Sequence, residues 1–137
     1  MEEEYSIALE EAYVAAARTR CWKCRASIDV VCLYCQRGTI DGEPYDEFSV
    51  SHITAIDEPL RRQLAPWPSL RFAFSRAVGF RYLANHCTRC GTLQGDYFLH
   101  CEPRGVFFTL KGALRGVVTL TPLTGPVRLS GDEGFEP

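Results

Sequence analysis

Two pairs of cysteines carry most of the chemistry available to this 137-residue chain. Two residues separate Cys21 from Cys24, and two separate Cys87 from Cys90. This spacing lets one tight turn direct both sulfur atoms at a single ion, and two such turns complete a tetrahedral site. Gly91, directly after the second pair, suits a turn position with positive φ. The pattern predicts one structural Zn²⁺ ion with four protein ligands: Cys21, Cys24, Cys87 and Cys90.

The two cysteine pairs are far apart in the chain, with 62 residues between Cys24 and Cys87. A zinc ribbon usually separates its two turns by about 15–20 residues. Because loop closure grows only with the logarithm of length, the longer connection costs about 1 kcal/mol more. Zinc binding contributes roughly 10–16 kcal/mol in small structural sites. We therefore expect the connecting segment to fold with its own strands and helix beside the ribbon.

Cys32 and Cys35 have the spacing of a third pair, but they lie within an apolar run at 28–35. In a regular strand their side chains would point to opposite faces. We interpret both as core residues, with a second metal site, membership of the first site or a redox pair as alternatives. A second site could draw on further residues whose simpler interpretation is a core or surface position: His86, His100 and Cys101.

Residue patterns along the chain predict a mixed, β-rich fold. The spacing of apolar residues at 2–19 predicts a helix, which ends near Glu11 if the first cysteine turn follows a strand. A second, short helix is expected over 58–64, where Pro59 suits its first position and Pro66 ends it. A surface loop is expected at 38–47. Strands are expected at 28–35, 48–53, 70–75, 80–85, 96–101, 106–110 and 117–120.

The predicted fold class is α+β, with two cysteine-turn hairpins forming a zinc ribbon and a long strand and helix segment inserted between them. Residues 1–129 are expected to form one domain, and 130–137 a disordered tail.

Charge is unevenly distributed although the net charge is only −2. Residues 18–115 carry 14 bases and 9 acids, and thirteen of the fifteen bases in the chain are arginine. No segment has the 18 uncharged apolar residues of a membrane-spanning helix, so no membrane association is expected. The N-terminus lacks the pattern of a secretory signal, and the seven cysteines are expected to be reduced. These features favour the cytoplasm.

Two separated motifs resemble those of a family of small, mostly uncharacterised bacterial and phage zinc-ribbon proteins. They are CWKC at 21–24 and NHCTRCGTLQGDYFLH at 85–100, and the similarity covers roughly residues 18–108. The resemblance implies zinc at the same four cysteines and implies no known reaction. The chain departs from the family at Cys32 and Cys35, where apolar residues are expected. Three residues of the second motif are interpreted as hydrogen-bonding scaffold, with a functional polar patch as the alternative: Gln94, Asp96 and His100.

A non-enzymatic binding module is the first functional hypothesis, because four thiolates leave zinc no open position for water. The partner is either nucleic acid or protein, and the oligomeric state is left open. Trp22 is interpreted as a lid over the sulfur atoms, with stacking on a nucleobase as the alternative. Basic residues are expected to cluster at the tips of the turns: Arg18, Arg20, Lys23, Arg25 and Arg89.

Two enzymatic alternatives come from other residues. An HNH-like nuclease could use His52 together with Asn85 and His86, although Ser51 stands where an acid is expected. A thiol oxidoreductase could use Cys32 and Cys35.

Overall fold

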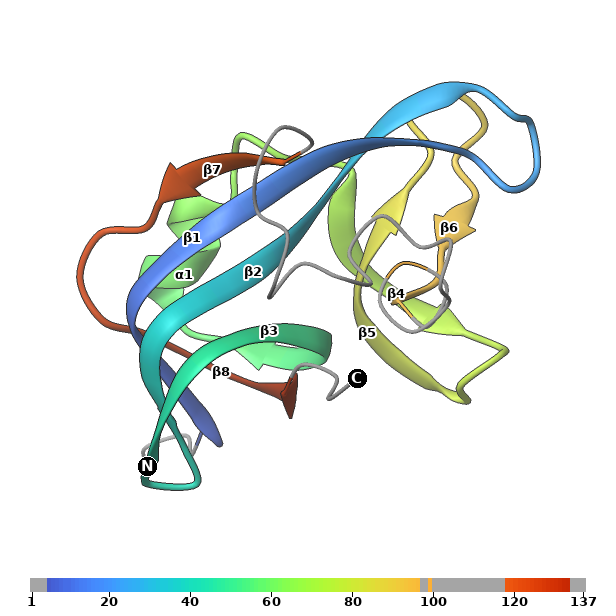
Figure 1. The fold of residues 1–137 in the computed structure, drawn as a ribbon. Helices are drawn as coiled ribbons and strands as arrows, with labels where there is room; N and C mark the ends of the chain where they lie inside the picture. The colour runs from blue at the N-terminus through green and yellow to red at the C-terminus, as the bar shows by residue number, and fades with distance from the viewer. Residues whose placement is uncertain (1–4, 97–98, 100–117, 134–137) are drawn as a thin grey trace.

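The computed structural model describes residues 5–96, 99 and 118–133 (Figure 1). This part of the chain is almost entirely β-structure with one short helix. The predicted α+β class with zinc-ribbon hairpins is therefore wrong, since the fold is mostly β and is built on a closed barrel of four strands. Its elements are β1 (Ile7–Arg20), β2 (Ser27–Ile40), β3 (Glu43–Ile56), α1 (Glu58–Gln63), β4 (Leu70–Ser75), β5 (Phe80–His86), β6 (Leu93–Gln94), β7 (Thr119–Pro122) and β8 (Val127–Glu133).

The barrel is formed by β1, β2, β3 and β8. β1 pairs antiparallel with β2, and β2 pairs antiparallel with β3. β8 lies between β3 and the start of β1, which closes the ring (Figure 1). β7 pairs with β1 further along the same edge. A second sheet adds the β4–β5 hairpin and β6, and it joins the barrel where Ile53 of β3 pairs with Leu83 of β5.

The helix predicted at 2–19 is wrong, because β1 occupies most of this segment. A register shift between Leu9 and Ala12 interrupts the two-residue alternation of β1. Further along, both faces of the strand are buried, since Val14 belongs to one core cluster and Ala15 to the other. The resulting apolar spacing resembles that of a helix although the backbone is extended.

The loop predicted at 38–47 is also wrong. Its residues extend β2 and β3, and they are joined by a two-residue turn at Asp41 and Gly42. Both turn residues have positive φ, 52° and 83°, as a tight hairpin turn requires.

The other expected elements agree in large part with the structure. The strands predicted at 28–35 and 48–53 lie within β2 and β3, and those at 70–75 and 80–85 correspond to β4 and β5. β7 overlaps the strand expected at 117–120. β6 returns from the second cysteine turn, while most of the strand predicted at 96–101 lies outside the described residues. Residues 130–133 belong to β8 and not to a tail, while the strand predicted at 106–110 lies outside the described residues.

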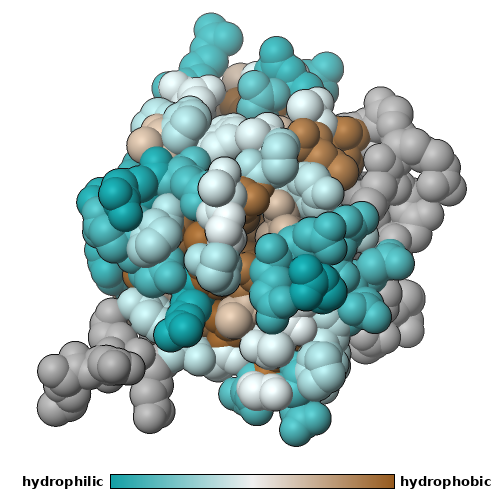
Figure 2. Space-filling view, turned by 90° about the vertical axis from the view of Figure 1, so that its left-hand side faces the viewer, coloured by the Kyte–Doolittle hydropathy of each residue, from teal (hydrophilic) through white to brown (hydrophobic). Residues whose placement is uncertain are grey.

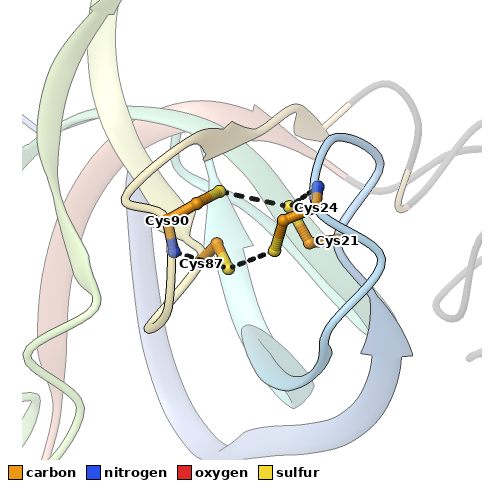
Figure 3. Close-up of side chains that lie close together, drawn as sticks. All are labelled: Cys21, Cys24, Cys87 and Cys90. Carbon is orange, nitrogen blue, oxygen red and sulfur yellow. Dashed lines mark hydrogen bonds between the residues drawn. The ribbon is translucent and has the colours of Figure 1, made fainter.

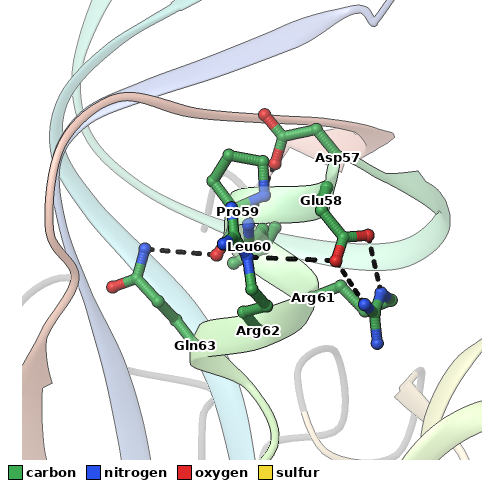
Figure 4. A network of polar contacts seen from close by, with 7 residues as sticks. All are labelled: Asp57, Glu58, Pro59, Leu60, Arg61, Arg62 and Gln63. Atoms are coloured by element: carbon green, nitrogen blue, oxygen red, sulfur yellow. Dashed lines mark hydrogen bonds and ion pairs between the residues drawn. The ribbon is translucent and has the colours of Figure 1, made fainter.

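The helix predicted at 58–64 is confirmed as α1. The Asp57 carboxylate caps it by accepting the Leu60 N–H at 3.0 Å. The other oxygen of Asp57 accepts the Arg128 N–H of β8 at 2.9 Å. Glu58 and Arg61 form an ion pair on the exposed side of the helix (Figure 4). Asp57 therefore fixes α1 against β8, and Leu60 is fully buried in the core.

Apolar side chains form two core clusters on the two sides of the barrel wall. The first fills the barrel and includes Leu9, Leu33 and Val50. The second includes Ile28 and Tyr34 and extends to the cysteine turns. The side of the molecule seen in Figure 2 is mostly hydrophilic, with apolar residues visible in narrow strips between polar ones. Within the described ranges, the chain has no helix long and apolar enough to cross a membrane.

Candidate metal centre

The sulfur atoms of the four predicted ligands converge at one place, all within 4.8 Å of one another (Figure 3). Cys21 and Cys24 lie in the turn between β1 and β2, which we call the first cysteine turn. Cys87 and Cys90 lie between β5 and β6, in the second cysteine turn. The sequence prediction that these four side chains come together is confirmed.

The distances between the sulfur atoms fit ligation of one ion. Two pairs across the turns, Cys21 with Cys90 and Cys24 with Cys87, are each separated by 3.6 Å. A disulfide would bring two sulfurs to about 2.0 Å, and the six cysteines of the described residues are all free. Zinc–sulfur bonds of about 2.3 Å in a tetrahedron place the sulfurs about 3.8 Å apart. The cluster is therefore placed to bind a metal ion.

The two cysteine turns repeat the same backbone hydrogen bonds. The sulfur of the first cysteine in each turn accepts N–H groups from the residues two and three positions later, at 3.4 Å for Cys21 and 3.3 Å for Cys87. The N–H of the same cysteine donates to the carbonyl five positions later, that of Ala26 or Thr92. Because N–H groups stabilise a thiolate, both turns are prepared to hold negative sulfur.

The pKa values of the two thiols in the first cysteine turn are shifted in opposite directions. Burial of Cys21 opposes its ionisation, but N–H groups of Cys24 and Lys23 outweigh burial and lower its pKa to about 6. The pKa of Cys24 is raised to about 11 although the Ala26 backbone favours its thiolate, because burial and the neighbouring sulfurs oppose a further negative charge. Four adjacent thiols cannot all ionise alone, so a cation would replace their protons on binding.

Residues around the cluster fix its geometry. Cys21 and Cys87 are buried, whereas Cys24 and Cys90 are exposed. Gln94 is fully buried, and its Nε2 donates to Cys21 Sγ at 3.4 Å and to the Thr92 carbonyl at 2.9 Å. This agrees with the scaffold role predicted for Gln94. Such contacts to a ligand atom orient it and tune its affinity for metal.

Trp22 connects the two halves of the site. Its Nε1 donates to the Leu93 carbonyl of β6 at 2.9 Å, so the indole is held between the first cysteine turn and β6. The side chain nevertheless stays 57% exposed. It therefore offers a fixed aromatic surface to solvent.

Cys32 and Cys35 are core residues, as predicted. They pack into different clusters, Cys32 into the second and Cys35 into the first, so they point to opposite faces of β2. Burial raises the pKa of Cys32, and it raises the pKa of Cys35 to about 11. Neutral buried thiols are poor nucleophiles. The other possible ligands His100 and Cys101 lie outside the described residues.

The residues of the nuclease hypothesis hold structural elements together. Asn85 accepts the Val31 N–H at 2.8 Å and donates to the Val31 carbonyl at 2.9 Å. His86 Nδ1 lies 3.1 Å from the Ser69 carbonyl. Both side chains are buried. They connect β5 to β2 and to the segment before β4, and both polar atoms of the Asn85 side chain already bind the backbone of Val31.

His52 and Asp96 form a separate buried contact. The Asp96 carboxylate accepts the His52 N–H at 2.7 Å, and His52 Nδ1 lies 3.5 Å from Asp132 Oδ2. Burial lowers the pKa of His52 and raises the pKa of Asp96 to about 7. This accords with the scaffold role predicted for Asp96.

A cavity of about 230 Å³ beside the second cysteine turn was not predicted. It lies between the hairpin of β1 and β2, the segment 66–69 and the second cysteine turn. The sequence signal was the tripeptide Pro66, Trp67, Pro68, which places an aromatic ring in a rigid segment after the helix.

The fold and the cluster together define a small β-barrel protein with four cysteines placed to bind a metal ion. Comparisons of this chain with protein-family models, curated proteins and solved structures returned no match. The resemblance to small zinc-ribbon proteins stays a prediction.

Proposed function

We propose that the four cysteines bind one structural Zn²⁺ ion, and that the protein is a non-enzymatic binding module for single-stranded nucleic acid. The spacing of the sulfur atoms, with the N–H groups directed at them, supports the metal assignment. Four thiolates suit zinc rather than magnesium or calcium, which prefer oxygen ligands. A complete set of protein ligands leaves no open position, so the ion would act structurally.

A structural ion explains how the second sheet is held to the barrel. Among the described residues, β3 and β5 pair at Ile53 and Leu83 alone. The metal would join the β1–β2 turn to the β5–β6 turn, just beyond the C-terminal end of β5. It would therefore act together with the Asn85 contact to Val31, which lies between these two points.

Metal analysis of the purified protein tests this assignment. We expect one zinc per chain by native mass spectrometry, and loss of zinc in Cys24→Ser and Cys90→Ser, which alter exposed ligands. Cys35→Ser is the matched control, because it changes a thiol of the barrel core and should retain one zinc. Two ions per chain, or iron in place of zinc, would overturn the assignment.

Charge segregation along the barrel supports nucleic acid as the partner. Figure 1 shows the first cysteine turn and the β2–β3 turn at opposite ends of β2. The cysteine-turn end carries five exposed bases, of which Arg18 pairs with Asp29 at 3.3 Å. The opposite end carries exposed acids: Glu10, Glu11, Asp41, Glu43, Asp46 and Glu47. The small net charge is therefore the sum of a basic end and an acidic end of the barrel. We call the five bases at the cysteine-turn end the basic turn surface: Arg18, Arg20, Lys23, Arg25 and Arg89.

The basic turn surface combines charge with an aromatic ring. Four of its bases form no ion pair within the described part of the chain, and Trp22 is exposed beside them. Proteins that bind single strands combine a positive track for the phosphates with aromatic side chains on which bases stack. This combination favours a nucleic acid over a protein partner.

Salt-dependent binding of a single-stranded oligonucleotide tests the partner. Four phosphate contacts predict a slope of about −3 for log affinity against log salt. Lys23→Ala and Arg89→Ala should each weaken binding, whereas Arg37→Ala at the acidic end is a matched control that should not. Absence of binding at low salt, or capture of a protein partner that the basic substitutions leave unaffected, would contradict the proposal.

A further inference from the structure

The cavity beside the second cysteine turn has walls from three separate parts of the chain. Arg18 and Asp29 come from the β1–β2 hairpin, Trp67 from the segment between α1 and β4, and Thr88 from the second cysteine turn. Its volume of about 230 Å³ is below the range of about 300–1,000 Å³ found for drug-sized ligands. The cavity therefore suits one small ring system.

Buried polar contacts hold these walls in place. His86 contacts the carbonyl of Ser69, and Asn85 binds both backbone groups of Val31. Ser69 and Val31 both line the cavity. Thr88 lies between two of the metal ligands, Cys87 and Cys90. The shape of the cavity thus depends on β5 and on the second cysteine turn.

The lining offers one aromatic wall. Trp67 is half-buried and packs against the barrel core, so its ring cannot rotate freely. The prolines on each side restrict its backbone further. An aromatic side chain held in this way is a platform on which a planar ring can stack.

The other residues that line the cavity supply both hydrogen-bond donors and hydrogen-bond acceptors. Arg18 supplies donors and Asp29 supplies acceptors at an exposed ion pair, and Thr88 adds a hydroxyl. A nucleobase has a planar face together with donors and acceptors on its edge. A free phosphate has no planar face to stack on Trp67. An aliphatic group could not form hydrogen bonds with Arg18 and Asp29.

We propose that this cavity receives one unpaired nucleobase of the strand bound at the basic turn surface. The inference rests on the proposed function, because Arg18 belongs to both the surface and the cavity. A base within a duplex is stacked and paired, so it could enter only after unpairing and unstacking, which cost a few kcal/mol. The basic turn surface attracts any phosphate backbone, and the cavity adds a preference for single strands.

The two tryptophans of the chain allow a direct test. Trp22→Phe leaves Trp67 as the only tryptophan, so its fluorescence reports on the cavity. Titration with a single-stranded oligonucleotide should quench this fluorescence, because a stacked base quenches an indole. A duplex of equal length, an abasic oligonucleotide and inorganic phosphate, each at matched occupancy, should leave it unchanged.

Substitution of the aromatic wall gives an independent readout. Trp67→Leu should weaken single-strand binding about 10-fold, as expected for loss of one stacked base. Duplex affinity and the salt slope should not change. Because Trp67 also contacts the core, Trp67→Phe keeps a ring there and should retain most of the affinity. Chemical unfolding of both variants shows whether they are folded under the binding conditions.

The outcomes separate the two proposals. If no oligonucleotide binds, the proposed function fails and the cavity inference fails with it. If single strands bind, but Trp67 fluorescence is unchanged and folded Trp67→Leu binds normally, the cavity inference is overturned while the proposed function stands. Preference for single strands, quenching and the effect of Trp67→Leu together support both.

Discussion

Arg25 and Gly91 occupy equivalent positions in the two cysteine turns. Each directly follows the second cysteine, and each donates its N–H to the carbonyl of the first, at 3.0 and 2.9 Å. Both have positive φ, 68° for Arg25 and 79° for Gly91. Glycine adopts this conformation freely, whereas another residue loses about 1–2 kcal/mol there. The first turn therefore keeps an exposed arginine where a glycine would fit with less strain.

Arg25→Gly should separate stability from binding. Relief of the strained φ is offset by the greater backbone entropy of glycine in the unfolded chain, so the free energy of unfolding should change by less than about 1 kcal/mol. Loss of one phosphate contact should reduce the salt slope for single-strand binding by about 0.7. Unfolding in urea and fluorescence anisotropy measure the two effects. An unchanged slope would exclude Arg25 from the binding surface.

Gly91→Ala isolates the conformational requirement of the second turn. Among the described residues, no atom beyond the two adjacent residues lies within 4 Å of a Cβ built on Gly91, so the substitution introduces no clash with them. Its expected effect is the strain of positive φ alone, a loss of about 1 kcal/mol in the free energy of unfolding of the zinc-bound protein. Gly95→Ala is the matched control, because a Cβ on Gly95 likewise meets no atom of the described residues within 4 Å, and Gly95 has no positive φ. Equal stability of the two variants would contradict this account.

The two cysteine turns were predictable because each is specified by local sequence. The spacing of Cys21 and Cys24, and the glycine after Cys90, specify both turns without knowledge of the rest of the fold. The short helix was equally readable, since Pro59 and Pro66 mark its ends.

The barrel was not predictable from such local signals. β1 carries a register shift and is buried on both faces, so its apolar residues do not alternate. Closure depends on β8 pairing with Ile7 to Leu9 at the other end of the chain. The roles of Asn85 and His86 likewise depend on contacts with Val31 and Ser69, which sequence spacing does not show.

Asn85→Ala should weaken the attachment of β5 to β2. It leaves the buried N–H and carbonyl of Val31 without their present partner, and each such group costs about 1–3 kcal/mol. We expect a loss of about 2–4 kcal/mol in the free energy of unfolding, measured in urea. Gln36→Ala, which removes an exposed amide bonded to Tyr13, should change stability by less than about 0.5 kcal/mol. A similar small effect at Asn85 would show that the Val31 contacts are dispensable.

Gln94→Met tests the hydrogen bond to the buried ligand. Methionine keeps most of the volume of Gln94 but cannot donate to Cys21 Sγ. Loss of a contact that orients a metal ligand typically lowers metal affinity 10- to 100-fold, so we expect about a 10-fold decrease in zinc affinity. Competition with a chromophoric chelator measures it. Unchanged affinity together with reduced stability would limit Gln94 to a packing role.

Asp96→Asn should change how stability depends on pH. The Asp96 carboxyl is 6% exposed, and burial raises its pKa to about 7 from an ordinary value of 3.8. The folded protein therefore holds a proton at this site that the unfolded chain has already lost. Between about pH 4 and pH 7 this group reduces stability as pH rises, by about 1.4 kcal/mol per pH unit. Above pH 7 its contribution is constant.

The other titratable groups near Asp96 should not produce the same difference in the pH dependence of stability. Cys32 and Tyr82 both have raised pKa values, that of Tyr82 about 12, so both stay neutral. Burial lowers the pKa of His52 and Asp96 does not contribute to that shift, so the substitution should leave it in place, and asparagine can still accept the His52 N–H. From pH 5.5 to pH 8, the native protein should therefore lose on the order of 2 kcal/mol of stability relative to Asp96→Asn. Parallel pH dependences of the two unfolding free energies would show that Asp96 is ionised throughout.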